Sequence, residues 1–322
     1  MVLAGDTRAV ARLISDIDDG IPGVRQVLKE LYPHTGGAYI IGITGAPGVG
    51  KSTLVDQMIG HLRKEGKTVG IIAIDPTSPF SGGAILGDRI RMQRHSNDDG
   101  VFIRSLATRG QFGGLTQSTR SAIDVLDAMG KDYIIVETVG VGQDEVEIVK
   151  NAHTTVIVVI PGMGDDIQAI KAGILEAGDI FVINKSDRDG ADRTLNDLRT
   201  MIEMGQKRNE ESDWLPIVLE TEAIADNGIR ELLDEIREHR KHLLKTMGDM
   251  NLRSRKDRAR EELAEMVKSR LLQQVFSRIA QGDEFEEAVE SIVQGKKDPY
   301  TVSDELVLKR LNVLNTSQST DQ

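Results

Sequence analysis

The chain has 322 residues, of which 39% are hydrophobic and 28% are charged, so it is long enough for a large domain with an appendage. It carries 40 basic and 51 acidic side chains, and the resulting net charge of −11 disfavours nucleic acids and anionic membranes as partners. The sequence contains no cysteine, which excludes disulfides, thiolate metal sites and cysteine nucleophiles.

Residues 1–35 are predicted to form an N-terminal helical extension, because apolar residues between Val10 and Ile17 recur at helical spacing. Charged residues interrupt this segment, unlike the apolar core of a signal peptide. The longest stretch free of Asp, Glu, Lys and Arg covers residues 31–50 and is broken by glycine, proline and histidine, unlike a membrane-spanning helix. We therefore expect a soluble, cytoplasmic protein.

Short apolar, β-branched runs alternate with helical patterns over residues 36–247, which we predict to form the main domain. The predicted strands are residues 39–43, 69–74, 133–136, 155–160, 180–183 and 217–219. The predicted helices between and after them are residues 51–64, 116–129, 167–177, 194–204 and 229–244. Continuous apolar runs are typical of strands buried on both faces of a sheet, so the pattern predicts an α/β fold with a mostly parallel sheet flanked by helices.

Strand patterns end before residues 248–322, which we predict to form a C-terminal helical extension. Within a strongly charged segment, an apolar residue recurs every four positions at Leu263, Val267, Leu271, Val275 and Ile279. A dimerisation arm explains this stripe, and so does a helix packed on its own domain. The arm is favoured, because a long helix beyond a complete core needs a surface that buries its apolar face.

A phosphate-binding motif follows the first predicted strand. Residues 45–52 read Gly-Ala-Pro-Gly-Val-Gly-Lys-Ser, a full match to G-x-x-x-x-G-K-[ST] between a strand and a helix. The glycines allow backbone N–H groups to surround a β-phosphate, Lys51 would bridge the β- and γ-phosphates, and the Ser52 hydroxyl would bind Mg²⁺. A turn that merely connects strand and helix is the alternative. The motif predicts nucleotide binding by Gly45, Gly48, Val49, Gly50, Lys51, Ser52 and Thr53.

A second motif, Asn-Lys-Ser-Asp at residues 184–187, follows the fifth predicted strand and matches the N-K-x-D signature of guanine-specific NTPases. The Asp187 carboxylate can accept from both N1–H and the 2-amino group of guanine, whereas adenine would leave it unpaired. We expect Asn184 to support the loop and the stem of Lys185 to cover the base. A weaker signal, Thr221 and Ala223, occupies the place of the Ser/Thr-x-Ala segment beside the base.

Acidic residues suggest a magnesium site. Asp75 directly follows the second predicted strand, Asp88 lies thirteen positions on, and Glu137 follows the third strand at the position of the usual D-x-x-G aspartate. If the loops bring them together, the three carboxylates would hold one cation, and Lys51, Asp88 and Glu137 would act in hydrolysis. The alternatives are a helix-capping or turn role for Asp75 and a solvated carboxylate for Glu137.

The position that usually holds the water-orienting glutamine carries a different residue. Val141 stands where Ras-type enzymes have a glutamine, and Gln143 comes two positions later. We therefore predict slow unaided hydrolysis, with mobile glycine-rich segments that a partner orders. Arg104, Arg109 and Gln111 are candidates for completing the site, and ordinary surface positions are the alternative.

Together, residues 45–53, 74–92, 137–143 and 184–187 resemble those of the MeaB/ArgK/MMAA GTPases, which belong to the SIMIBI class of P-loop proteins. The resemblance is strong over residues 36–247 and implies a P-loop NTPase fold with GTP or GDP and Mg²⁺ as cofactors. It assigns Lys51 and Ser52 to phosphate and Mg²⁺, Asp75, Asp88 and Glu137 to the acidic metal-site positions, and Asn184 and Asp187 to the guanine.

The resemblance also implies a homodimer and a partner, an adenosylcobalamin-dependent acyl-CoA mutase, with methylmalonyl-CoA mutase as the default. The protein would then be a chaperone that gates delivery of intact cofactor to the mutase and excludes damaged cofactor.

Three other functions stay open: a metal-insertion GTPase, an ATP-using kinase or transport ATPase, and a scaffold whose nucleotide turnover is incidental. The sequence offers few soft ligands for metal delivery, and we interpret His239 and His242, on one helix face, as a solvated pair. The N-K-x-D motif argues against the ATP-using enzymes.

Overall fold

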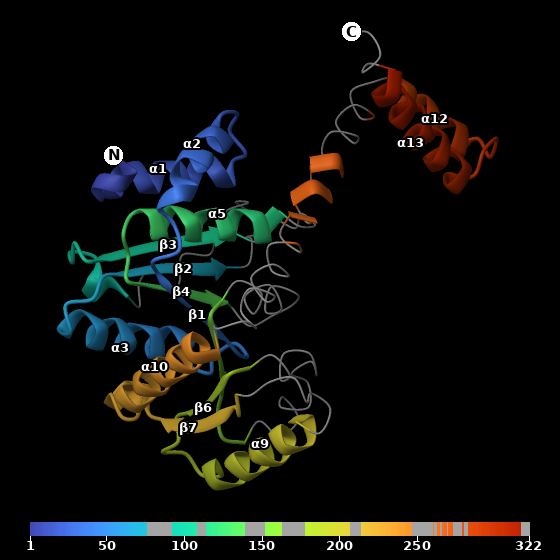
Figure 1. Ribbon diagram of the computed structural model, residues 1–322. Coiled ribbons are helices and arrows are strands. Elements are labelled where there is room, and N and C mark those ends of the chain that lie inside the picture. The colour runs from blue at the N-terminus through green and yellow to red at the C-terminus, as the bar shows by residue number, and fades with distance from the viewer. Residues whose placement is uncertain are drawn as a thin grey trace. The chain divides into compact units, whose positions relative to one another are not determined.

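The computed structural model describes residues 1–75, 92–107, 114–138, 152–162, 178–206, 214–246, 260, 263–264, 266–268, 270–272, 279 and 283–316 (Figure 1). These residues belong to two compact units, Met1–Met247 and Gly248–Gln322. Within the described ranges, no helix has the length and apolar character needed to cross a membrane.

A seven-stranded sheet in the order β3-β2-β4-β1-β5-β6-β7 forms the centre of the first unit (Figure 1). Its strands are β1 Tyr39–Thr44, β2 Val69–Asp75, β3 Val101–Ala107, β4 Tyr133–Thr138, β5 Thr154–Val159, β6 Ile180–Asn184 and β7 Ile217–Thr221. Every neighbouring pair is parallel. The predicted α/β fold with a mostly parallel sheet is therefore confirmed.

Helices cover both faces of this sheet (Figure 1). One face packs against α3 (Lys51–Lys64) and α10 (Ile229–Thr246), whose buried Met58 and Leu232 meet Ile41 and Ile43 of β1 in one apolar cluster. The other face is covered in two places: over β2, β3 and β4 by α1, α2 and α5, and over β5 and β6 by α9. These helices span Thr7–Asp18, Val24–Leu31, Gly114–Ala128 and Ala191–Gln206. Burial on both faces explains why the central strands are continuous apolar runs.

The edge strand β3 was not predicted from the sequence. It carries Arg104 and Ser105 in its middle, which interrupt the apolar run that marks the other strands. Arg104 is in register with Ile72, which belongs to the apolar cluster shared with α1 and α5, and its Nη2 donates to Ser15 Oγ of α1 over 2.8 Å. Arg104 is therefore held against α1 in the middle of β3, and the prediction that it helps to complete the catalytic site is wrong. Arg109 and Gln111 lie outside the described residues.

The start of β1 is fixed by a single carboxylate from α5. Asp127, 8% exposed, accepts hydrogen bonds from the backbone N–H groups of Gly36, Gly37 and Ala38 over 2.6, 3.1 and 2.8 Å. These bonds satisfy donors that precede the strand and hold its entry into the sheet. Because β1 leads directly into the phosphate-binding motif, Asp127 helps to set the position of that motif.

The second unit contains the helices α12 (Asp283–Val293) and α13 (Pro299–Thr316). Asp298 caps α13 by accepting from the backbone N–H and the hydroxyl of Thr301 over 2.9 and 2.6 Å. Of the predicted apolar stripe, Leu263, Val267 and Leu271 are exposed, and Ile279 is buried. Val275 lies outside the described residues.

The interpretation of His239 as a solvated residue is wrong. His239 is 2% exposed, its Nδ1 lies 2.9 Å from Thr154 Oγ1, and the Trp214 ring packs against it at a centroid distance of 4.6 Å. Burial lowers the pKa of His239 from 6.5 to about 4, and the neighbouring His242 and His153 add to the shift. Asp179 Oδ1 lies 3.6 Å from Nε2, too far for a hydrogen bond, and does not offset the burial.

We expect the free energy of unfolding to fall as the pH drops from 7 to 4. In the unfolded chain His239 takes up a proton near pH 6.5, whereas in the folded chain it does so only near pH 4. Between these two pH values the unfolded chain binds more protons than the folded chain, so the stability present above pH 6.5 is lost as the pH falls toward 4. The loss at pH 4 is about 3 kcal/mol. Urea unfolding across this range should show a shallower pH dependence for His239→Gln than for the unmodified chain. His242→Gln, at the half-buried neighbour, is the control; equal slopes for all three proteins would contradict the prediction.

Candidate functional site

The candidate site lies at the carboxyl edge of the sheet, around the loop between β1 and α3. The strand β1 is central, with β4 on one side and β5 on the other, so the connections of its neighbours diverge at this point. In parallel sheets, such a divergence leaves a crevice outside the carboxyl ends of the strands, and ligands bind there.

Two glycines of the phosphate-binding motif stand where no side chain fits. Gly45 has φ +144°, and a Cβ there would overlap the carbonyl oxygen of Val158 on β5. Gly50 has φ +96°, and a Cβ there would overlap the side-chain amide of Asn184. The motif therefore packs directly against β5 and against the loop after β6, and any larger residue would push these loops apart.

Lys51 is the first residue of α3 and is only 5% exposed. Its ammonium group donates to the carbonyl oxygens of Gly45 over 2.7 Å and Ala46 over 3.0 Å. The charge is therefore held inside the curve of the loop, at the N-terminus of a helix whose dipole also favours anions. This arrangement suits a phosphate group.

Ser52 and Glu137 form a buried oxygen pair beside Lys51. The Ser52 hydroxyl, on a residue 4% exposed, donates to Glu137 Oε1 over 2.7 Å, and Glu137 at the end of β4 is 3% exposed. The alternative of a solvated carboxylate is therefore wrong for Glu137. Next to this pair, the hydroxyls of Thr44 and Thr138 lie 3.0 Å apart and are both buried.

The Ser52 and Glu137 oxygens are hard ligands that fit Mg²⁺. Asp75 ends β2, next to β4, so its backbone reaches the same edge of the sheet, but its side chain lies outside the described residues, as does Asp88. Among the side chains that the structure describes, no group of three His, Asp or Glu residues is arranged around a common point. Of the three predicted carboxylates, Glu137 is thus the one whose side chain lies within the described residues.

Asn184, at the end of β6 and 2% exposed, joins three loops. Its Nδ2 donates to Val49 O over 2.8 Å, and its Oδ1 accepts from Thr221 Oγ1 over 3.2 Å and from Ala223 N over 3.1 Å. The P-loop, the N-K-x-D loop and the segment after β7 are therefore held together by one amide group. The structure brings the predicted Thr221 and Ala223 to this junction.

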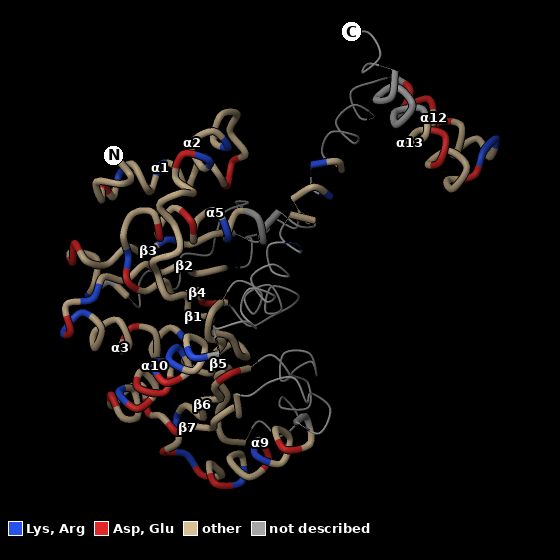
Figure 2. Tube along the Cα trace, viewed as in Figure 1, with Lys and Arg blue, Asp and Glu red and all other residues tan. Residues whose placement is uncertain are grey.

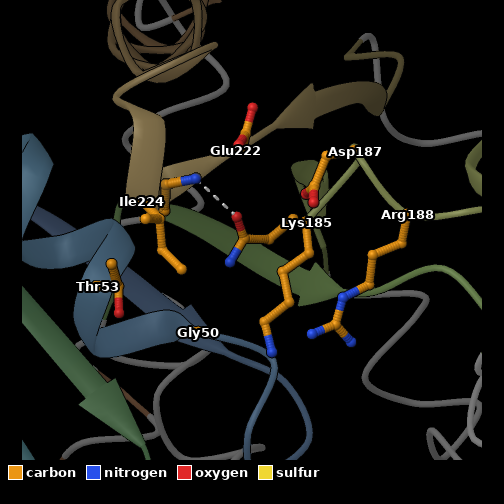
Figure 3. Close-up of a pocket in the computed structure, with 9 residues that line it drawn as sticks. Gly50, Thr53, Lys185, Asp187, Arg188, Glu222 and Ile224 are labelled. Carbon is orange, nitrogen blue, oxygen red and sulfur yellow. Dashed lines mark hydrogen bonds between the residues drawn. The ribbon is translucent and has the colours of Figure 1, made fainter.

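A cavity of about 220 Å³ opens at the junction, lined by Gly50, Thr53, Asn184, Lys185, Asp187, Arg188, Glu222, Ala223 and Ile224. In Figure 3, Thr53 and Ile224 lie on one side of it and Lys185 and Arg188 on the other. The Lys185 ammonium donates to Gly48 O over 2.8 Å, so its stem crosses the gap between the two motifs. Lys185 has φ +56°, a left-handed backbone conformation that few residues other than glycine adopt.

Three residues of the cavity lining, Arg188, Glu222 and Ile224, were not predicted from the sequence. Arg188 and Glu222 adjoin predicted residues but resemble ordinary charged surface residues, of which Figure 2 shows many along α9 and α10. Ile224, 81% exposed and directly after Ala223, carried a usable signal, because a large apolar residue beside a binding motif suggests contact with a ligand.

We expect Asn184→Ala to lower the free energy of unfolding of the first unit by about 3 kcal/mol. The substitution leaves Val49 O, Ala223 N and the Thr221 hydroxyl without their buried partner, and each such loss is costly. Urea unfolding followed by circular dichroism measures the difference. Asn196→Ala, at an exposed position on α9, should cost less than about 0.5 kcal/mol. Equal stability of the two variants would contradict the assigned role of Asn184.

Residues 9–280 match the family described as methylmalonyl-CoA mutase-associated GTPase MeaB. A protein of Pyrococcus abyssi, named as a GTPase, is 52% identical over 307 residues, which cover 95% of this chain and 94% of that protein. The mitochondrial methylmalonic aciduria type A homolog of Mus musculus is 37% identical over 207 residues, 63% of this chain and 49% of that protein.

The crystal structure of a LAO/AO transport system kinase has the same fold, with a TM-score of 0.66. The sequences are 24% identical, and the match covers 95% of this chain and 93% of the other. The family match and the identity to the Pyrococcus abyssi protein both extend over most of the chain. This chain therefore belongs to the MeaB family of P-loop GTPases, which bind guanine nucleotides.

Proposed function

We propose that this protein is a Mg²⁺-dependent GTPase that serves as a chaperone of a cobalamin-dependent acyl-CoA mutase. Its nucleotide state would gate the loading of adenosylcobalamin and protect the mutase, with methylmalonyl-CoA mutase as the default client. The proposal that the protein binds a guanine nucleotide is supported by the junction at Asn184. There, one buried amide joins the phosphate loop to the guanine-specific motif. The chaperone part rests on the family.

Guanine would enter the cavity between Lys185 and Ile224. Asp187, which lines this cavity, would accept hydrogen bonds from N1–H and the 2-amino group, a pairing that adenine cannot offer. The stem of Lys185 would cover one face of the base, and the apolar side chain of Ile224 would contact it from the opposite side. Selectivity for guanine then follows from one carboxylate, because adenine would leave its charge desolvated and unpaired.

The phosphates would lie over the P-loop. Lys51, already inside the loop, would donate to β- and γ-phosphate oxygens, and the loop N–H groups would surround the β-phosphate. Ser52 and Glu137 would hold Mg²⁺, together with Asp75 and Asp88 as the family resemblance implies. When bound, the ion would stabilise the negative charge that develops on the phosphate oxygens. Lys51, Glu137 and Asp88 are the residues we assign to this charge stabilisation.

The partner proposal rests on two similarities. The matching family is described by its association with methylmalonyl-CoA mutase, and a relative in Mus musculus is named for methylmalonic aciduria. We also propose a homodimer, supported by the exposed side chains of Leu263, Val267 and Leu271, because a second copy would cover such an apolar stripe.

We expect Asp187→Asn to weaken GDP binding by at least about 2 kcal/mol, because an amide presents a donor where guanine also presents donors. Titration calorimetry with GDP and ADP measures the effect. The unmodified chain should bind GDP far more tightly than ADP, and the variant should lose most of this difference. Asp189→Asn, two positions on at an exposed site, is the matched control. Equal affinity of the unmodified chain for GDP and ADP would refute the guanine assignment.

We also expect the cognate apo-mutase to stimulate GTP hydrolysis at least about tenfold, equal to about 1.4 kcal/mol of barrier. A partner that binds the ordered catalytic form raises the population of that form, and the nucleotide changes mutase affinity in return. The measurement is GTP turnover across a titration of apo-mutase, with Lys51→Ala as the blank. A flat response would leave a GTPase without the chaperone role. Nucleotide binding without turnover, with or without mutase, would instead support a scaffold.

A further inference from the structure

The segment that we assign to the guanine is tied to the helix that follows the phosphate loop. Gln57 lies on α3, six positions after Lys51, and is half-buried. Its Nε2 donates to Ala223 O of the 3-10 helix η4 (Ala223–Ala225) over 3.1 Å. Since Ala223 N donates to Asn184, the peptide groups on both sides of the Ala223 Cα are fixed by side chains from other elements.

A second contact determines which way the Gln57 amide points. Arg94, in the 3-10 helix η3 (Gln93–His95), donates from Nη2 to Gln57 Oε1 over 3.0 Å. An arginine only donates and a backbone carbonyl only accepts, so the amide oxygen must face Arg94 and the amide nitrogen must face Ala223. Arg94 is held in turn by Asp56, whose Oδ1 accepts from Nε over 2.9 Å and whose carbonyl accepts from Nη2 over 2.8 Å.

The far end of the same segment is also attached to α3. His61, one turn after Gln57, lies with Nε2 2.8 Å from Oδ1 of Asp226, the residue that ends η4 with φ +61°. The helix that carries Lys51 and Ser52 at its start therefore holds both ends of η4 along its length. Because the helix is rigid, it fixes the spacing between the phosphate site and the base segment.

We propose that Gln57 is a positioning residue for guanine recognition, oriented by Arg94, that holds the Ala223 segment at the distance from the phosphate loop that a guanine nucleotide requires. This inference rests on the proposed guanine-nucleotide site and adds to it two residues outside the cavity lining. Gln57 acts through Ala223 and does not contact the nucleotide. Its loss should therefore affect the base-dependent part of binding and leave hydrolysis of the bound nucleotide unchanged.

Gln57→Glu is the sharpest test, because it keeps the length of the side chain and the acceptor for Arg94. It removes the amide donor and adds a negative charge, so a carboxylate oxygen faces the Ala223 carbonyl and repels it. We expect the Kd for GDP to rise about tenfold and the preference for GDP over ADP to fall by a similar factor. The KM for GTP should rise while kcat stays within about twofold. Gln26→Glu, the same change at an exposed position on α2, should alter none of these values.

Arg94→Ala gives a second, independent test at an exposed side chain, and it applies even if Gln57→Glu does not fold. It should weaken GDP binding about threefold in the unmodified background. In the Gln57→Met background, which already lacks both hydrogen bonds, it should add nothing, because Arg94 acts through Gln57. Additive effects of the two substitutions would overturn the role of Arg94.

The outcomes separate this inference from the function on which it rests. If the unmodified chain prefers GDP to ADP and neither Gln57→Glu nor Gln57→Met reduces that preference, the positioning role is wrong and the guanine site stands. If the unmodified chain shows no preference for GDP, the guanine site and the positioning role are both wrong. Thermal unfolding of each variant shows whether a weaker affinity reflects a loss of folded protein. The comparison of the two nucleotides is a second control, because a loss of folded protein would lower GDP and ADP binding equally.

Discussion

The three hydrogen bonds of the buried Asn184 amide set the distance between two loops that lie far apart in the sequence. Val49 belongs to the phosphate loop after β1, and Ala223 follows β7 at the edge of the sheet. The covalent bonds of a nucleotide limit the distance between its base and its phosphates, so a site that binds both depends on the spacing of these loops. An apolar side chain at this position would leave backbone groups of both loops buried without a hydrogen-bond partner, whereas the amide satisfies them.

The sequence was sufficient to predict the parts of the molecule that depend on local pattern. The phosphate loop and the N-K-x-D loop are short motifs whose chemistry depends on adjacent residues, and the central strands are continuous apolar runs. The strand β3 was missed because an edge strand has one neighbour and carries Arg104, which is satisfied by a helix that the local sequence does not reveal. The same limit applies to His239, whose helical spacing did not indicate that Trp214 and Thr154 cover it.

The contacts of Gln57 and Asp127 could not be predicted for a related reason. Each is a polar residue on a helix, a position that by pattern alone suggests solvent, and each is used instead to bind backbone groups far away in the sequence. A carboxylate or amide on a helix can serve strand entries and loops only after the helix has packed on the sheet. Such residues are therefore recognised from their partners and not from their neighbours in the sequence.

These two residues act at opposite ends of the same path. Asp127 fixes the start of β1, and β1 leads into the phosphate loop. The helix α3 begins directly after this loop and holds the Ala223 segment through Gln57. A shift at any step moves the phosphate site and the base segment relative to each other. Arg94 lies six positions after Asp88 in the sequence. The segment that contains this candidate metal ligand is therefore followed closely by the residue that orients Gln57. The helix that carries Lys51 at its start therefore also holds the Ala223 segment farther along its length.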